Sequence, residues 1–266
     1  MKPSPRRPQR RRSGAAAALL GGFLVEAALL TPLLVLGRVD PAAAAAAIVT
    51  YALIAALVWQ ARDWTGRAGF GLANTVTCLR AGMIAVLPSL ILAREPPDPG
   101  LAWAVIGFAL AALALDGLDG RLARRRDESS AFGARFDMEV DAGFVLFLSS
   151  LVATTGRVGP WVVSTGLMRY LWIGAGLHWP LLRQPLPSSL FRKSVCVVLL
   201  LLLLAALAPI VPPDWAPLPC LAGLGLLLAS FGRDLVWLVR RAGMATPARI
   251  QKGASLYDGT PRVESE

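Results

Sequence analysis

Long apolar runs, separated by short polar segments, make up most of the chain. A helix needs roughly 17–25 apolar residues to cross the hydrocarbon core of a bilayer. By length and hydropathy we expect eight such helices, at residues 15–37, 42–60, 76–93, 101–120, 137–155, 159–180, 194–212 and 217–240. The segments between them are too short for a large soluble domain, so the pattern predicts an all-α, polytopic membrane helical bundle.

Two polar features interrupt the apolar pattern in its first third. Residues 61–74 read ARDWTGRAGFGLAN, which predicts a short interfacial helix with Trp64 and Phe70 at the lipid boundary. Glu26 is the only acidic or basic residue within the first two spans. We interpret it as a helix-packing or snorkelling carboxylate rather than a catalytic one.

Composition and charge refine this picture. Of the 266 residues, 55% are hydrophobic and 17% are charged, and the formal net charge is +10. A nucleic-acid partner would also suit that charge, but the basic residues gather at the two ends and in alternate loops, as the positive-inside rule expects. They are Arg62 and Arg67, Arg121 to Arg126, Arg183, Arg192 and Lys193, and the tail from Arg240 to Lys252. We therefore expect no nucleic-acid partner, a location in the cell inner membrane, and both termini in the cytoplasm.

Four aspartates carry the strongest chemical signal. Asp116 and Asp119 lie three residues apart at the end of one span, and Asp137 and Asp141 lie four apart at the start of the next. Each pair shares a helix face, so all four can converge at the cytoplasmic edge of the membrane. Close carboxylates repel one another, and two divalent ions, Mg²⁺ or Mn²⁺, would relieve that repulsion. Simple pairing with nearby arginines is the alternative, which the facing helical spacings disfavour.

Small and basic residues lie between the two aspartate pairs. Gly120 and Gly133 lack a Cβ and permit the close approach of a nucleotide, while Ala123 keeps the same face shallow. Arg124 is a candidate diphosphate partner, although basic residues here also serve topology.

The segment from Asp116 to Asp141 matches the pattern D-x2-D-G-x2-A-R-x8-G-x3-D-x3-D. In this it resembles the CDP-alcohol phosphotransferase (CDP-alcohol phosphatidyltransferase) family. The resemblance implies that Asp116, Asp119 and Asp137 bind metal, and that Asp141 is the general base and also touches a metal. It further implies that the CDP site is lined by Gly120, Ala123, Arg124 and Gly133.

A second, shorter element carries the same resemblance. Asn74, Thr77 and Arg80 are similar to the N-x2-T-x2-R element that opens the first core helix of the family and faces the nucleotide. Asn74 at this place is also a reasonable helix N-cap. Both interpretations stay open at this point.

The resemblance divides the chain into four parts. Residues 1–14 form a basic cytoplasmic tail, and residues 15–62 hold two transmembrane helices that the family pattern does not require. Residues 63–241 correspond to the six-helix membrane domain of the family, and residues 242–266 form a cytoplasmic C-terminal tail.

The implied activity is a metal-dependent transfer in phospholipid biosynthesis. A phosphatidyl group would pass from CDP-diacylglycerol to the hydroxyl of a small polar alcohol, with release of CMP, in a membrane enzyme that faces the cytoplasm. Family members are often homodimers, so a homodimer is expected. Alternatives are a CDP-choline/ethanolamine-type phosphotransferase with a lipid acceptor and, in another class, an ion- or proton-coupled transporter that uses the Asp cluster.

Four further cations are candidates for binding a phosphate of the acceptor or of a lipid. They are Arg169, Arg192, Lys193 and Arg233. Arg169 lies deepest in a predicted span and is costly to bury, which leaves a structural ion pair as its alternative. Arg233 has alternatives too, in its neighbour Asp234 and in the lipid headgroups.

Overall fold

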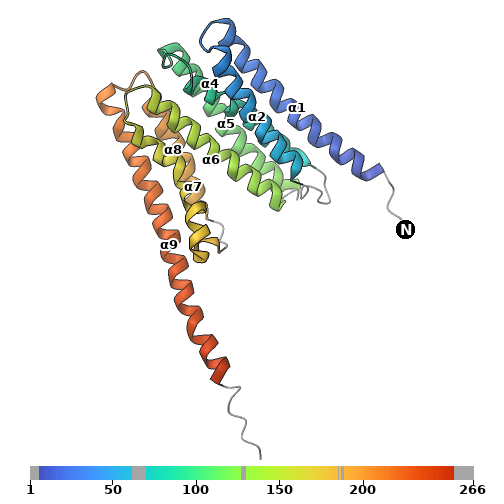
Figure 1. The fold of residues 1–266 in the computed structure, drawn as a ribbon, viewed down its shortest axis with the longest axis vertical. Coiled ribbons are helices and arrows are strands. Elements are labelled where there is room, and N and C mark those ends of the chain that lie inside the picture. The colour runs from blue at the N-terminus through green and yellow to red at the C-terminus, as the bar shows by residue number, and fades with distance from the viewer. Residues whose placement is uncertain (1–5, 62–69, 127–129, 185, 187–188, 255–266) are drawn as a thin grey trace, which may run out of the picture.

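The computed structural model describes residues 6–61, 70–126, 130–184, 186 and 189–254, and within these ranges every regular element is helical. The α-helices are α1 (Arg6–Val35), α2 (Pro41–Gln60), α3 (Gly71–Ala85), α4 (Leu87–Ile91), α5 (Pro99–Arg126), α6 (Ala131–Thr154), α7 (Val163–His178), α8 (Leu190–Leu207) and α9 (Pro217–Ala254). Short 3-10 turns, η2 (Pro160–Val162), η3 (Pro180–Arg183) and η4 (Pro213–Trp215), join the last helices. Figure 1 shows the resulting bundle, in which α9 runs well past its neighbours α7 and α8.

The expected membrane bundle is confirmed. In the described part of the chain, six helical segments are long and apolar enough to span a membrane: Gly14–Val35, Pro41–Gln60, Gly71–Ile91, Pro99–Gly117, Leu190–Leu207 and Pro213–Ala242. The first two precede the six-helix core, as predicted. The other two predicted spans coincide with α6 and α7. The first half of α6 carries several charged residues, and α7 has only 16 residues, so neither stands out by length and composition alone.

Three helices extend further than hydropathy indicated. α1 begins within the basic N-terminal tail, α5 continues through Arg126, and α9 continues to Ala254. Hydropathy measures the length of the apolar stretch, whereas arginine, lysine and alanine also favour helix in water. The ends of the membrane-spanning stretches are therefore not the ends of the helices.

Side-chain caps fix where two of the helices begin. The Ala43 amide donates to Asp40 Oδ1 at 2.8 Å and starts α2, and the Gly133 amide donates to Ser130 Oγ at 2.9 Å and starts α6. Such caps satisfy amides that have no partner inside the helix. The hydrogen bond from Ala43 also holds the pKa of the Asp40 carboxyl below its ordinary value.

The α3–α4 segment lies at the centre of the bundle. Of its most apolar stretch, 72% is buried inside the protein, against at most 39% for the other five candidate spans. α3 packs against α1, α5 and α6. Accordingly, Asn74, Thr77 and Arg80 of α3 are buried inside the protein.

A close crossing joins α1 to α3. A Cβ on Gly82 would overlap the carbonyl oxygen of Gly22, so only glycine allows the two backbones to approach this far. The Tyr51 hydroxyl of α2 donates to Leu19 O of α1 at 2.7 Å and ties the two N-terminal helices together. The N-terminal pair is thus packed tightly onto the core.

Phe70 does not lie where the sequence suggested. It is only 4% exposed and packs against Phe132, with ring centroids 6.5 Å apart. Phe70 directly precedes α3, whose start is covered by α6, and this explains its burial. The lipid-boundary prediction is therefore wrong for Phe70, whereas Trp64 and the rest of residues 62–69 lie outside the described residues.

Glu26 is enclosed by protein. Its exposed fraction is 1%, and neither carboxylate oxygen has a hydrogen-bond partner among the described residues. Snorkelling to the membrane surface is thus excluded for this side chain. Since a buried polar group without a partner costs about 1–3 kcal/mol, Glu26 destabilises the fold at this place.

The Gly22–Gly82 crossing leads to a first prediction. We expect Gly82→Ala to separate α1 from α3 and to lower the free energy of unfolding by about 1–3 kcal/mol, because the added methyl overpacks the interface. Thermal denaturation in detergent measures the change. Gly107→Ala on α5 is the control, since a Cβ there meets nothing within 4 Å. Equal stability of the two variants would contradict the packing described above.

Glu26 leads to a second prediction. Glu26→Met replaces an unpartnered carboxylate by an apolar side chain of similar length, so we expect the midpoint of thermal denaturation in detergent to rise by a few degrees. Glu95→Met, at an exposed position in the loop before α5, should leave the midpoint unchanged. A lower midpoint for Glu26→Met would show that Glu26 has a stabilising partner.

Candidate active site

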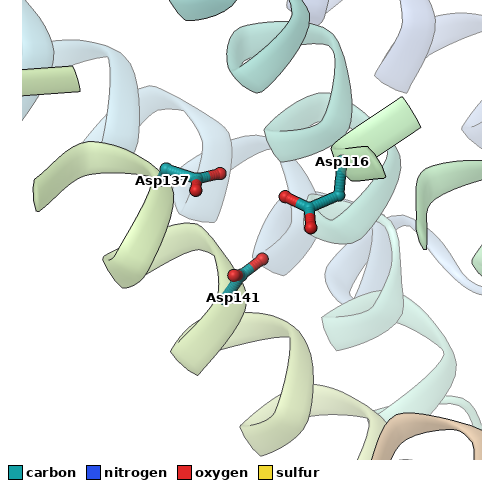
Figure 2. Close-up of side chains that lie close together, drawn as sticks. All are labelled: Asp116, Asp137 and Asp141. Carbon is teal, nitrogen blue, oxygen red and sulfur yellow. The ribbon is translucent and has the colours of Figure 1, made fainter. Parts of the chain in front are cut away.

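Three of the four predicted aspartates converge. Asp116 comes from α5 and Asp137 and Asp141 from successive turns of α6, and each offers one carboxylate oxygen that lies within 4.8 Å of the other two. Figure 2 shows the three side chains pointing toward one another across the gap between the two helices. Their side chains are 27%, 37% and 28% exposed, so the cluster is open on one side. We refer to these three residues as the carboxylate trio.

Arg80 of α3 closes the inner side of the carboxylate trio. Its side chain is 0% exposed, and its Nη1 lies 2.7 Å from Asp116 Oδ1 and 2.8 Å from Asp137 Oδ1. Its Nη2 lies 2.6 Å from Asp141 Oδ1. Nε donates to the carbonyl of Ala112 at 3.1 Å. A single guanidinium therefore contacts both helices that carry the trio.

The charges explain this arrangement. Three carboxylates at such distances repel strongly, and a buried guanidinium without partners would be very costly. Pairing them reduces both penalties, and the planar fork of arginine can bind several carboxylate oxygens at once. The trio with Arg80 still carries formal charge −2, which favours a cation at the open side.

The residues of the N-x2-T-x2-R element lie on one face of α3. Asn74 and Thr77 are 8% and 3% exposed, and both bond to backbone carbonyls four residues earlier. Phe70 occupies the position of the helix N-cap, so the capping alternative for Asn74 is wrong. A role of these residues toward a nucleotide stays a prediction.

Gly133 is a point of contact between α6 and α3. A Cβ on Gly133 would lie 2.6 Å from Asn74 Oδ1 and 3.1 Å from Ser130 Oγ. The lack of a side chain thus allows α6 to begin beside Asn74. The nucleotide role expected of Gly133 stays a prediction beside this packing role.

The remaining motif residues lie near the end of α5. The backbone from Asp116 through Arg126 is helical, which confirms the helical spacing assumed for Asp116 and Asp119. The side chains at positions 118–126 lie outside the described part, and this set includes Asp119, Gly120, Ala123 and Arg124. Their expected roles as a metal ligand and in the CDP site stay predictions.

Two of the candidate phosphate-binding cations form ion pairs with acidic side chains. Arg169 of α7 pairs with Glu139 and lies 2.9 Å from Met138 Sδ, both on α6. Arg192 of α8 reaches both oxygens of Asp234 on α9 at 3.2 Å. Asp234, one of the two alternatives considered for Arg233, is thus bonded to Arg192 across helices.

Two cations at the same end of the bundle remain. The Arg233 guanidinium lies 5.1 Å from the centroid of the Phe191 ring, and Lys193 is exposed. These contacts leave the phosphate role of all four candidates as a prediction.

The sequence contained a signal for the Arg80 pairing that the motif alone did not provide. Arg80 lies within the predicted span 76–93, where an arginine must find a counter-charge. The aspartates of the motif are acidic residues predicted at the same membrane edge. A pairing of Arg80 with aspartates of the motif could have been inferred from this constraint. Which of the aspartates contact Arg80 could not.

The donor set suits a hard divalent cation. Mg²⁺ and Mn²⁺ prefer oxygen ligands, and the trio offers only carboxylate oxygens, within a span that one ion can bridge. Asp116, Asp137 and Asp141 would hold such an ion on their open side, which faces away from Arg80.

Fold and site together define a helical membrane protein in which α5 and α6 bring together three carboxylates that could hold a cation. A sequence model described as CDP-alcohol phosphatidyltransferase matches residues 70–232, which is more than half of the chain. The chain belongs to the CDP-alcohol phosphatidyltransferase family, an enzyme family that transfers substituted phosphate groups. No curated protein and no solved structure matches the chain.

The trio leads to a prediction on metal binding. We expect Mn²⁺ to bind the detergent-solubilised protein, and Asp137→Asn to weaken that binding about tenfold or more, because a neutral amide replaces a charged ligand. Electron paramagnetic resonance of free Mn²⁺ measures the affinity. Asp214→Asn, at an exposed site outside the trio, is the control. Unchanged affinity in Asp137→Asn would exclude this residue as a ligand.

Proposed function

We propose that this protein transfers a phosphatidyl group from CDP-diacylglycerol to the hydroxyl of a small polar alcohol and releases CMP. The observation that carries the proposal is the carboxylate trio, held by Arg80, in a member of the CDP-alcohol phosphatidyltransferase family. Its position at the ends of apolar helices suits a reaction between a lipid donor and a water-soluble acceptor. Phospholipid biosynthesis is the corresponding process.

Asp141 is the proposed general base. One of its oxygens is fixed by Arg80 Nη2 at 2.6 Å, while the side chain stays 28% exposed, so the carboxylate is both oriented and accessible. It would accept the proton of the acceptor hydroxyl, whose oxygen forms a bond to the phosphatidyl phosphorus as the bond to CMP breaks. A hydroxyl is a weak nucleophile at neutral pH, which is why a positioned base is needed.

Asp116, Asp119 and Asp137 are the proposed metal ligands, together with Asp141. When bound, two divalent ions, Mg²⁺ or Mn²⁺, would neutralise negative charge on the diphosphate of the donor. Gly120, Ala123, Arg124 and Gly133 would line the CDP site, and Asn74, Thr77 and Arg80 would face it from α3. The burial of Asn74 beside Gly133 supports this grouping.

We propose a location in the cell inner membrane, with the site and both termini on the cytoplasmic side. The basic segments at the two ends and beside the carboxylate trio support this orientation. A homodimer is proposed on the family resemblance alone. The transporter alternative loses its support because the chain belongs to a family of transferases.

The activity has a direct test. Purified protein in detergent is incubated with Mg²⁺, CDP-diacylglycerol and a panel of small alcohols, and both CMP and the lipid product are identified by mass. We expect CMP release that depends on one alcohol and stops with EDTA. CMP release from CDP-choline or CDP-ethanolamine in the presence of diacylglycerol, and none from CDP-diacylglycerol, would instead identify the lipid as the acceptor.

Asp141→Asn gives the matching mutational prediction. We expect its rate of CMP release to fall by about 10²-fold or more, because the amide cannot take up the proton. Asp214→Asn, outside the site, should retain the wild-type rate. Full activity in a folded Asp141→Asn variant would remove the base assignment.

A further inference from the structure

Arg80 has an unusual position for an arginine. Its side chain is fully buried at the centre of a membrane bundle, whereas the three carboxylates around it are each about one-third exposed. The guanidinium thus lies beneath the trio, on the protein side, and leaves the outer side open. This placement separates the side chain from the direction in which a substrate or an ion would arrive.

The contacts of Arg80 connect three helices. From α3 it reaches Asp116 of α5 through Nη1, and Asp137 and Asp141 of α6 through Nη1 and Nη2. Nε is bound to the Ala112 carbonyl of α5, one turn before Asp116. The guanidinium plane is therefore oriented by the backbone as well as by the trio.

Without this cation the trio would not assemble by itself. Three carboxylates within 4.8 Å of one another, partly removed from water, would move apart or take up protons. Removing one partner of a buried ion pair is strongly destabilising because the other charge stays uncompensated. Before an ion binds, this geometry therefore depends on a positive charge that is part of the protein.

We propose that Arg80 is a resident counter-cation, which holds Asp116, Asp137 and Asp141 in place for ion binding independently of any bound ion. It acts as a positioning residue through the three carboxylates, and the nucleotide role expected of it stays a prediction beside this one. The donor set is then preorganised, and a divalent ion binds to it from the open side. This positioning of the trio does not depend on which donor or acceptor the enzyme uses.

Charge relief distinguishes this role from simple packing. In the wild-type background Asp116→Asn removes a partner of Arg80 and should lower the midpoint of thermal denaturation measured in EDTA. In an Arg80→Met background the same substitution removes a repelling charge and should raise it. A merely space-filling role for Arg80 gives the same sign in both backgrounds.

The experiment compares wild type, Arg80→Met, Asp116→Asn and the double variant, all in detergent with EDTA. We expect Arg80→Met to lower the midpoint by about 5 °C or more, and the double variant to recover part of this loss. Arg80→Lys, which keeps the charge with fewer donors, should lie between wild type and Arg80→Met.

A matched control uses Arg157, whose described partners are carbonyls such as Ala208 O at 3.0 Å rather than carboxylates. In an Arg157→Met background, Asp116→Asn should still lower the midpoint. If Asp116→Asn lowers the midpoint or leaves it unchanged in Arg80→Met as well, the proposal is wrong. Should Arg80→Met alone yield no folded protein, recovery of folded protein by the double variant supports the proposal, and no recovery overturns it.

Discussion

A buried arginine surrounded by aspartates is the interaction on which the rest of this site depends. Arg80 lies on the most enclosed of the six candidate membrane spans, where burial of an unpaired guanidinium would be very costly. Its pairing with carboxylates of α5 and α6 fixes how these two helices face α3. The same contacts collect the oxygen atoms that a divalent ion prefers, so one electrostatic requirement shapes both the fold and the chemistry.

Small residues make this arrangement sterically possible. Gly82 permits the crossing with α1, Gly133 permits the start of α6 beside Asn74, and a Cβ on Gly166 of α7 would overlap the backbone of Leu146 on α6. Helix association within a membrane depends on such close approach, because burial of apolar surface contributes little there. The glycines of this chain therefore serve helix packing at positions both inside and outside the motif.

The two additional helices lie against the core rather than apart from it. α1 and α2 both contact α3, and the ion pairs Arg38–Asp98 and Arg94–Asp40 join them to the segment before α5. They cover a face of α3 that would otherwise contact lipid. Glu26 of α1 is buried although its carboxylate has no hydrogen-bond partner among the described residues. The contacts of the described residues give no physical reason for an acidic side chain at this position.

The sequence by itself determined the membrane bundle, the two extra spans and the shared faces of the aspartates, because hydropathy and helical periodicity are local properties. It also indicated which aspartates form the carboxylate trio, because their spacing was that of a known family. Only the tertiary structure decided that Phe70 is buried, that Asp234 pairs with Arg192, and that Arg80 lies beneath the carboxylate trio. These outcomes depend on which helices become neighbours, and a buried charge selects its partner among residues far apart in the chain.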